Sequence, residues 1–179
     1  MIGPALLFCP ADRPERFAKA AAAADTVIID LEDAVAPADK AAARAALVAT
    51  PLDPARTIVR VNPAGTAAHA ADIEALRSTE YSMVMLAKTE SATQIDAVAE
   101  FAVFALCETA LGVVRAMEIA QHRSVAGMMW GAEDLIASLD GRSSRLPDGR
   151  YRDVARHARS TVLLAARAFG RLPIDAVHL

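Results

Sequence analysis

The stretch "TVIIDLEDAV", residues 26–35, combines a buried strand with a cluster of carboxylates. Four apolar or β-branched residues lead into Asp30, and Glu32 and Asp33 follow almost at once. A nearly continuous apolar run of this length is typical of a strand that is covered on both faces of a parallel sheet. Carboxylates at the end of such a strand do nothing for packing, so we expect a positively charged group to lie beside them.

Similar apolar runs recur along the chain and alternate with helical segments. The expected strands cover residues 6–10, 26–30, 57–62, 82–88, 101–108, 125–131 and 175–179. The expected helices cover residues 14–24, 37–49, 67–78, 91–100, 111–122 and 151–170. This alternation predicts an α/β fold with a parallel sheet and right-handed crossover connections.

Two architectures fit such a pattern, an open doubly wound sheet and a closed (β/α)₈ TIM barrel. The chain provides seven expected strands and stops within the apolar run at 175–179, whereas a barrel usually needs about 250 residues. We therefore expect a single barrel domain over residues 1–179, with the last strand, its helix and a C-terminal segment absent from this chain.

The composition excludes several classes of protein. With 54% hydrophobic residues and 23% charged residues, the 179-residue chain can bury one sizeable core. It has no basic tract for nucleic acid, no apolar run that could span a membrane and no signal peptide. Cys9 and Cys107 lie in apolar runs, which indicates buried thiols in a reducing cytoplasm.

Polar side chains end five consecutive expected strands. They are Asp30, Glu32 and Asp33, then Arg60 and Asn62, Lys88 and Glu90, Glu108, and finally Glu133 and Asp134. In a barrel the C-terminal strand ends meet at one mouth, where active sites are built. An open sheet binds ligands only near the point where its strand order reverses. Charge at the end of each strand in turn favours the barrel.

Glu108 is the most informative of these residues, because it directly follows the apolar run "FAVFALC". Burying its carboxylate without a partner would cost several kcal/mol or force protonation. A divalent cation solves this problem, and a few carboxylate oxygens with open water positions suit Mg²⁺. The four histidines show no zinc-ligand spacing. For Asp33 and Asp134, capping of the next helix is the alternative role.

Arg60 and the loop that starts at Gly131 both suit an anionic ligand. The planar guanidinium of Arg60 matches a substrate carboxylate or carbonyl, although an internal ion pair with Glu32 or Asp33 is the alternative. Gly131 precedes an expected helix start, so backbone N–H groups there can approach an anion. The sequence contains no Gly-x-Gly-x-x-Gly, Walker or Gly-x-Ser-x-Gly motif.

Eight stretches, in order along residues 4–179, resemble the citrate lyase β-subunit-like family of the HpcH/HpaI aldolase superfamily. They are "LLFCPADRPERFAKA", "IIDLEDAV", "KAAAR", "IVRVN", "MLAKTES", "ALCETALGV", "WGAEDL" and "AARAFGRLPIDAVHL". The resemblance implies a (β/α)₈ barrel assembled as trimers or hexamers. It also implies an enzyme that uses Mg²⁺ to break or form a carbon–carbon bond between an acyl-CoA and a 2-oxo acid.

The resemblance also assigns roles to particular residues. It makes Glu108 and Asp134 the Mg²⁺ ligands and Arg60 the contact to the oxo-acid oxygens, and these three form the catalytic set. Glu32 and Asp33 would hold metal-bound water. The substrate carboxylate would bind at backbone groups of Gly131, Ala132, Glu133 and Asp134. Arg13 and Lys19 would lie near the CoA nucleotide, where Arg16 could serve equally.

Two departures from the family pattern stand out. Ala87 precedes Lys88 where relatives often have proline, which leaves the direction of the Lys88 side chain open. An acidic residue that acts in a neighbouring subunit is expected beyond Leu179.

The expected function is cleavage of citryl-CoA, malyl-CoA or citramalyl-CoA, with oxaloacetate, glyoxylate or pyruvate as the oxo acid, or the reverse or thioesterase reaction. The alternatives are a CoA-independent pyruvate aldolase, and a non-catalytic or CoA-binding subunit of a lyase complex.

Overall fold

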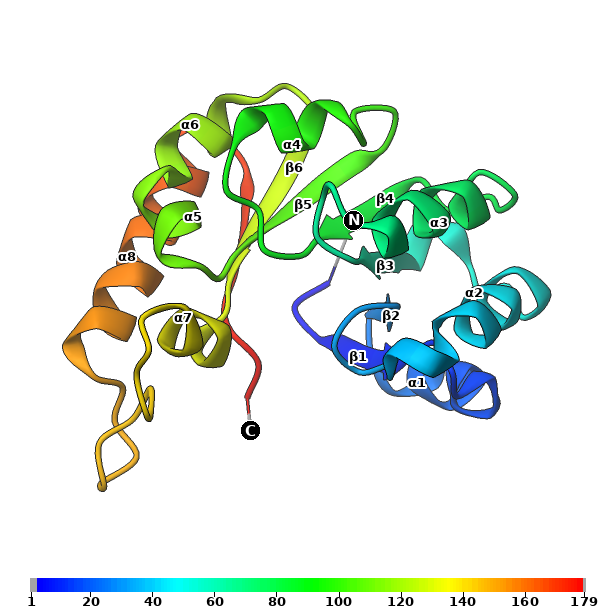
Figure 1. Cartoon of the computed structure of the whole chain (residues 1–179), viewed down its shortest axis with the longest axis horizontal. Helices are drawn as coiled ribbons and strands as arrows, with labels where there is room; N and C mark the ends of the chain where they lie inside the picture. Colours follow the sequence, from blue (N-terminus) through cyan, green and yellow to red (C-terminus); the bar gives the residue numbers. More distant parts are fainter. Residues whose placement is uncertain (1–2, 179) are drawn as a thin grey trace. The chain divides into compact units, whose positions relative to one another are not determined.

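A computed structural model describes residues 3–178 (Figure 1). The chain consists of two compact units, Met1–Met85 and Leu86–Leu179. The strands are β1 Leu6–Pro10, β2 Thr26–Asp30, β3 Thr57–Val61, β4 Met83–Leu86, β5 Ala102–Cys107, β6 Val125–Trp130 and β7 Leu172–Ile174. The helices are α1 Phe17–Ala23, α2 Lys40–Ala49, α3 Ala67–Leu76, α4 Ala92–Asp96, α5 Ala110–Val114, α6 Ala116–Gln121, α7 Ala132–Ser138 and α8 Asp153–Ala168. Three short 3₁₀ turns lie at Pro14–Arg16, Pro37–Asp39 and Pro54–Arg56.

The strands follow one another in the sheet in the order in which they occur along the chain, β1 to β7. The pairs β1–β2, β2–β3, β5–β6 and β6–β7 are parallel. An order without a reversal has no switch point, which excludes the doubly wound alternative. Residues 3–178 contain seven strands, one fewer than a complete (β/α)₈ barrel.

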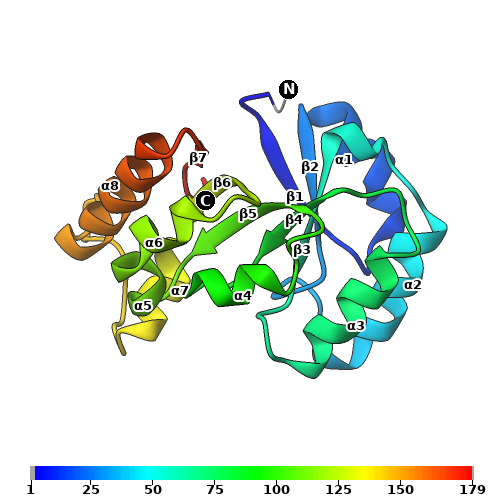
Figure 2. The ribbon, with the colours of Figure 1, turned by 90° about the horizontal axis from the view of Figure 1, so that it is seen from above.

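In the first unit, helices α1, α2 and α3 lie on the same side of strands β1 to β3 (Figure 2). The β2 residues are all buried, as expected from the apolar run. Phe17 on α1, Leu47 on α2 and Leu76 on α3 are fully buried and complete the core of this unit. Thr66 caps α3, because its hydroxyl accepts a hydrogen bond from the His69 N–H at 3.1 Å.

In the second unit, α8 packs against α6 and against strands β6 and β7 (Figure 1). Trp130, at the end of β6, and Phe104 on β5 are the largest core side chains of this unit. Ser91 and Thr109 cap α4 and α5 through their hydroxyl groups. These capped helices follow β4 and β5 directly, so the polar residues at the two strand ends have fixed positions.

The expected strand at residues 175–179 is wrong. The last strand is β7, Leu172–Ile174, and residues 175–178 form no strand, while Leu179 lies outside the described residues. Directly after the strand, the Asp175 carboxylate accepts hydrogen bonds from Trp130 Nε1, at 2.7 Å, and from the Arg159 guanidinium. Pro173 lies inside the strand, where proline is tolerated next to an open edge.

The expected helix at residues 111–122 is two short helices, α5 and α6, which meet at Arg115. The expected helix at 91–100 is shorter than its apolar pattern, because α4 ends at Asp96. The other expected strands and helices are found with shifts of a few residues at their ends.

Candidate functional site

The Asp30 carboxylate at the end of β2 organises the loop that follows. Asp30 is 1% exposed, and its oxygens accept the backbone N–H groups of Glu32 at 2.8 Å and Ala34 at 3.1 Å. The same carboxylate binds Arg60 Nε at 2.8 Å and Nη2 at 2.5 Å. Because Asp30 and Arg60 are paired in register across β2 and β3, the parallel sheet brings these opposite charges together.

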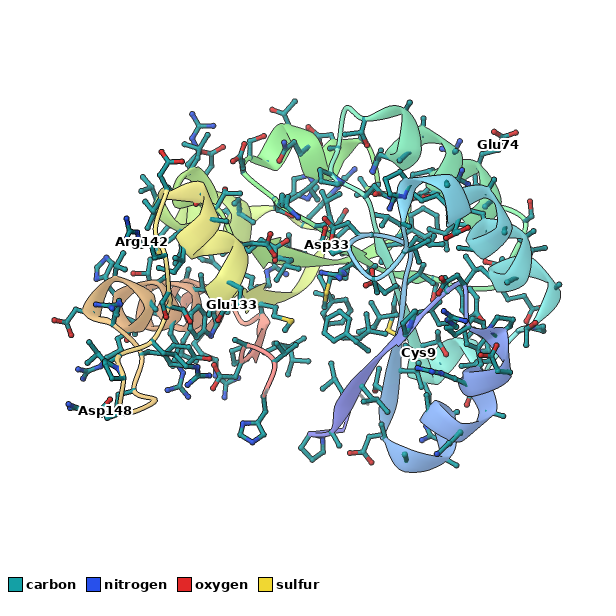
Figure 3. All side chains as sticks on the ribbon, turned by 60° about the horizontal axis from the view of Figure 1, so that its bottom comes forward. Cys9, Asp33, Glu74, Glu133, Arg142 and Asp148 are labelled. Atoms are coloured by element: carbon teal, nitrogen blue, oxygen red, sulfur yellow. The ribbon has the colours of Figure 1, made fainter. Side chains whose placement is uncertain are left out.

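Arg60 also pairs with Glu32, at 3.1 Å between Nη1 and Oε2, and its guanidinium lies 5.0 Å from the centre of the Phe8 ring. The alternative of an internal ion pair is therefore realised with Glu32, with Asp30 as a second partner. Figure 3 shows Asp33 on the loop after β2, and its backbone N–H donates to Glu32 Oε2 at 3.0 Å. The first unit thus holds a guanidinium between two buried carboxylates.

Two residues that the sequence did not point to hold this loop in place. Lys40 donates from Nζ to the carbonyl oxygens of Leu31 at 2.8 Å and Glu32 at 2.9 Å. Asp72 is fully buried and accepts hydrogen bonds from Arg44 Nη1 and from the Asn62 side chain. The sequence does contain an indication that Asp72 is buried, because this acid lies on the same face of α3 as the buried residues His69 and Ile73.

Glu108 directly follows β5 in the second unit and is 2% exposed. Its Oε1 accepts the Lys88 backbone N–H at 3.1 Å. Its Oε2 lies against Gly131, because a Cβ atom added at position 131 would be 2.7 Å from this oxygen. The Glu108 carboxylate therefore lies beside the start of α7, and only glycine permits this close approach.

Lys88 contacts the second acid of this cluster through its side chain, with Nζ 3.4 Å from Asp134 Oδ1. Its backbone has a φ of +50°, which is uncommon for a residue other than glycine. Lys88 thus reaches Glu108 with its amide and Asp134 with its ammonium group. The direction of this side chain, open at the level of sequence, is toward α7.

The first turn of α7 carries the other expected binding residues. Gly131 is the N-cap and no side chain caps the helix, so Asp134 does not have the capping role. Ala132 is buried, whereas Glu133 is exposed on α7 (Figure 3). The Glu133 carboxylate accepts a hydrogen bond from Ser144 Oγ at 2.6 Å. Ser144, buried in the loop between α7 and α8, is a further residue that the sequence did not indicate.

The expected CoA residues lie in the first unit. Arg13 lines a cavity of about 390 Å³ together with Asp12, Pro14, Asp39, Ala42 and Ala46. Lys19 is exposed on α1 and is not one of the residues that line it. The cavity therefore contains one of the two expected cations and two carboxylates.

The cysteines are buried free thiols, as expected. Burial raises the pKa of the Cys107 thiol to about 12, and the neighbouring Glu108 charge contributes to this increase. Burial also raises the pKa of Cys9, although the charge of Arg16 opposes the increase.

Within residues 3–178, no group of three or more His, Cys, Asp and Glu side chains is placed to hold a metal ion. None of the helices in this range combines the length and the hydropathy needed to span a bilayer.

Comparison with known sequences gives a family match. The model of the HpcH/HpaI aldolase/citrate lyase family matches residues 5–179. A citrate lyase subunit beta-like protein of Mycobacterium tuberculosis is 67% identical over 177 residues, which cover 99% of this chain and 65% of that protein. A (3S)-malyl-CoA thioesterase of Cereibacter sphaeroides is 37% identical, with 97% of this chain and 62% of the relative covered. The chain thus spans about two thirds of the length of these relatives or slightly less.

Solved structures of the M. tuberculosis protein are also similar. The citrate lyase beta subunit complexed with oxaloacetate and magnesium matches with a TM-score of 0.98 and 67% identity, over 99% of this chain and 80% of that chain. The protein CitE in complex with magnesium, acetoacetate and coenzyme A matches with the same score and identity, over 99% of this chain and 67% of that chain.

Proposed function

The chain belongs to the HpcH/HpaI aldolase/citrate lyase family, and from this membership we propose that the whole protein is a Mg²⁺-dependent carbon–carbon lyase. Its proposed substrate is a hydroxyacyl-CoA such as citryl-, malyl- or citramalyl-CoA, which is cleaved to an acyl-CoA and a 2-oxo acid or formed in reverse. The observation that carries the proposal is the buried Glu108 carboxylate, held by the Lys88 amide against the helix start that bears Asp134.

Glu108 and Asp134 are the proposed magnesium ligands. Both provide carboxylate oxygens, the donor that Mg²⁺ prefers, and Mg²⁺ needs only one or two protein carboxylates because it keeps several waters. The related M. tuberculosis protein binds magnesium together with oxaloacetate. When bound, Mg²⁺ supplies Lewis-acid polarisation of the substrate oxygen next to the bond that is cut or formed.

The start of α7 is the proposed site for the carboxylate of the oxo acid. Gly131 and Ala132 offer backbone N–H groups without a large side chain in front of them. Because the Glu133 carboxylate is tied to Ser144, we assign Glu133 a role through its backbone. The oxo acid is oxaloacetate, glyoxylate or pyruvate in this proposal.

For the first unit, we propose that Arg60 binds the oxygen atoms of the oxo acid. Asp30 accepts hydrogen bonds from Nε and Nη2 along one edge of its guanidinium, which fixes the plane of the donor fork before substrate arrives. Glu32, 4% exposed and paired with Arg60, and the neighbouring Asp33 are proposed to bind metal-bound water.

CoA is proposed to bind near Arg13 and Lys19, and the cavity beside Arg13 supports the first of these assignments. The related CitE structure with coenzyme A supports CoA as a ligand. We further propose a homotrimer or hexamer, in which an acidic residue of a neighbouring subunit supplies the general acid or base. The two free thiols support a cytoplasmic location.

The test is the cleavage of citryl-, malyl- and citramalyl-CoA by the intact protein with and without Mg²⁺. Glu108→Gln should lower both Mg²⁺ affinity and turnover by at least about 100-fold, because even loss of an outer partner of a metal ligand costs 10- to 100-fold. Glu118→Gln, at an exposed glutamate of α6, is the matched control and should behave as the parent. Equal Mg²⁺ affinity and turnover in Glu108→Gln and the parent would remove the metal-ligand assignment.

A second candidate is hydrolysis of the thioester, which the similarity to a (3S)-malyl-CoA thioesterase favours. The two reactions give different products from malyl-CoA. Cleavage yields acetyl-CoA and glyoxylate, whereas hydrolysis yields malate and free CoA. Release of a free thiol with no glyoxylate would favour the second candidate.

A further inference from the structure

We propose that Lys88 is a positioning residue that sets the balance between metal and anion at the acidic cluster of the second unit. Its ammonium group competes with a divalent cation for Asp134 and favours a bound oxo-acid anion. This inference rests on the proposed function, because it takes Glu108 and Asp134 as the metal ligands.

The first observation is the double contact of this one residue. The backbone N–H of Lys88 donates to Glu108 Oε1 at 3.1 Å, and its Nζ lies 3.4 Å from Asp134 Oδ1. The amide contact fixes Glu108 whatever the side chain at position 88 is. The ammonium contact depends on lysine or arginine at this position, so the two effects can be separated by mutation.

The second observation is the backbone conformation. Lys88 has a φ of +50°, a region that glycine or asparagine adopts at lower cost than lysine. Such strain is kept where the surrounding structure imposes it, and it concentrates at functional sites. Here the left-handed turn directs the amide to one acid and the side chain to the other. Glycine would adopt this turn at lower cost, so the backbone conformation does not explain why a lysine, with its ammonium group, occupies position 88.

The third observation is partial exposure of the ion pair. The side chains of Lys88 and Asp134 are 29% and 33% exposed, so solvent screens their attraction. The ammonium group can therefore leave Asp134 when a divalent cation takes the carboxylate. A buried pair would resist this exchange, because separation would leave an uncompensated charge in the protein interior.

Charge balance gives the direction of both effects. Glu108 and Asp134 together match the charge of one divalent cation, and the ammonium beside Asp134 places a positive charge close to this site, which repels the metal. An oxo acid then adds at least one negative charge next to Gly131 and Ala132, and the ammonium compensates it. Lys88 should thus weaken metal binding and strengthen anion binding.

The experiment measures both equilibria by titration calorimetry on the intact protein, with Mg²⁺ alone and then with pyruvate or oxaloacetate at saturating Mg²⁺. Lys88→Met should bind Mg²⁺ about 3- to 30-fold more tightly and the oxo acid less tightly by a similar factor, because one charge is removed within a few ångströms. In steady-state kinetics, the weaker binding of the oxo acid in Lys88→Met should raise the KM for this substrate more than it lowers kcat. Lys88→Arg should restore parental values for both ligands.

Arg150→Met is the matched control, since it removes the cation of an exposed ion pair with Asp148 in the same unit. It should leave both affinities unchanged, and thermal unfolding checks that each variant is folded. Unchanged or weaker Mg²⁺ binding in a folded Lys88→Met variant overturns the inference while the proposed function stands. A parent protein that binds no Mg²⁺ overturns the proposed function and, with it, the role of Lys88.

Discussion

At position 131 the chain has only a hydrogen atom where any other residue would place a carbon. The Glu108 carboxylate uses this space, and an added Cβ would lie 2.7 Å from Oε2 and 2.9 Å from the Glu108 Cβ. These distances are too short for real Cβ contacts, so one of the two segments would have to move. The glycine is therefore required by a neighbouring side chain and not by its own backbone angles.

Gly131→Ala should displace Glu108. We expect a loss of stability of about 1–3 kcal/mol from overpacking. We also expect Mg²⁺ affinity to fall by roughly 10-fold or more, the size of effect seen when a ligand loses its supporting contact. Urea unfolding and Mg²⁺ titration measure the two effects.

Gly141→Ala is the control, because an added Cβ there would crowd the Ile136 side chain at 2.7 Å instead of a carboxylate. It should cost stability without changing Mg²⁺ affinity. If both variants bind Mg²⁺ equally well, Gly131 has no part in placing Glu108.

The sequence singles out residues at which side-chain chemistry and position along a strand coincide. Glu108 stands out because an acid directly follows the apolar strand β5. Arg60 stands out because a guanidinium lies near the end of the apolar strand β3. Lys40 and Ser144 were not identified, because their partners lie 8 to 11 residues away along an irregular loop. Their role depends on the path of that loop, which residue type and spacing do not encode.

At the scale of elements, Asp72 joins three segments of the first unit. It accepts hydrogen bonds from Arg44 on α2, from the Asn62 backbone at 3.0 Å and from the Asn62 side chain at 2.6 Å. Asn62 in turn donates to the Leu31 carbonyl oxygen at 2.9 Å. This chain of contacts links α3 to the loop that carries Glu32.

Asp72→Asn should therefore destabilise the protein by about 2–4 kcal/mol, because a buried carboxylate with several charged or amide donors is lost. Asp96→Asn on α4 removes a pair between His122 and a 69% exposed carboxylate and should cost less than about 1 kcal/mol. Urea unfolding of both variants measures the difference. Similar losses in the two variants would show that Asp72 does not connect these elements.

A second junction of elements is sensitive to pH. Burial alone would raise the pKa of Asp175, but hydrogen bonds from Arg159 and Trp130 outweigh it and lower this pKa below its usual value. The unfolded chain therefore binds this proton more readily than the folded protein. The stabilisation is present above the unfolded pKa of about 4 and is lost as pH falls through the folded value.

The difference in melting temperature between the parent and Asp175→Asn should accordingly shrink as pH is lowered from 7 to 3. Asp148→Asn is the matched control, because it removes a titrating carboxylate from an exposed ion pair. It should change the melting temperature little at pH 7. A difference between the parent and Asp175→Asn that is independent of pH would argue against a stabilising carboxylate at the junction of β6, β7 and α8.

The types of the elements could be predicted, but several of their ends could not. Continuous apolar runs identified the strands because a strand covered on both faces has no polar side. The stretch at 111–122 has one helical pattern, yet the chain breaks it at Arg115, where φ is −95° and ψ is 11°. β7 ends at Ile174, and the next residue, Asp175, makes its contacts with Trp130 and Arg159, which are distant along the chain. Contacts of this kind are not visible in a local pattern.

At the scale of the whole molecule, strand–helix alternation predicted the class of fold and the order of the strands. Sequential order from β1 to β7 follows from repeated right-handed crossovers, each of which adds the next strand on the same side. The seven strands within residues 3–178 equal the apolar runs in number, although β7 lies at Leu172–Ile174 and not in the run at 175–179. The grouping of residues into two compact units was not predicted, since the composition does not change near residue 85.

Each compact unit contains one buried cysteine, Cys9 in the first and Cys107 in the second. The protein thus carries a built-in chemical reporter in each half. Because burial raises its pKa to about 12 and encloses it, Cys107 should react with a disulfide reagent at pH 8 far more slowly than an unfolded thiol. Cys9→Ser and Cys107→Ser leave one reporter each, so labelling against urea concentration follows the opening of each half by itself. Fast labelling of Cys107 in native buffer would contradict its enclosure, whereas the rate of slow labelling reports how often the core of the second unit opens.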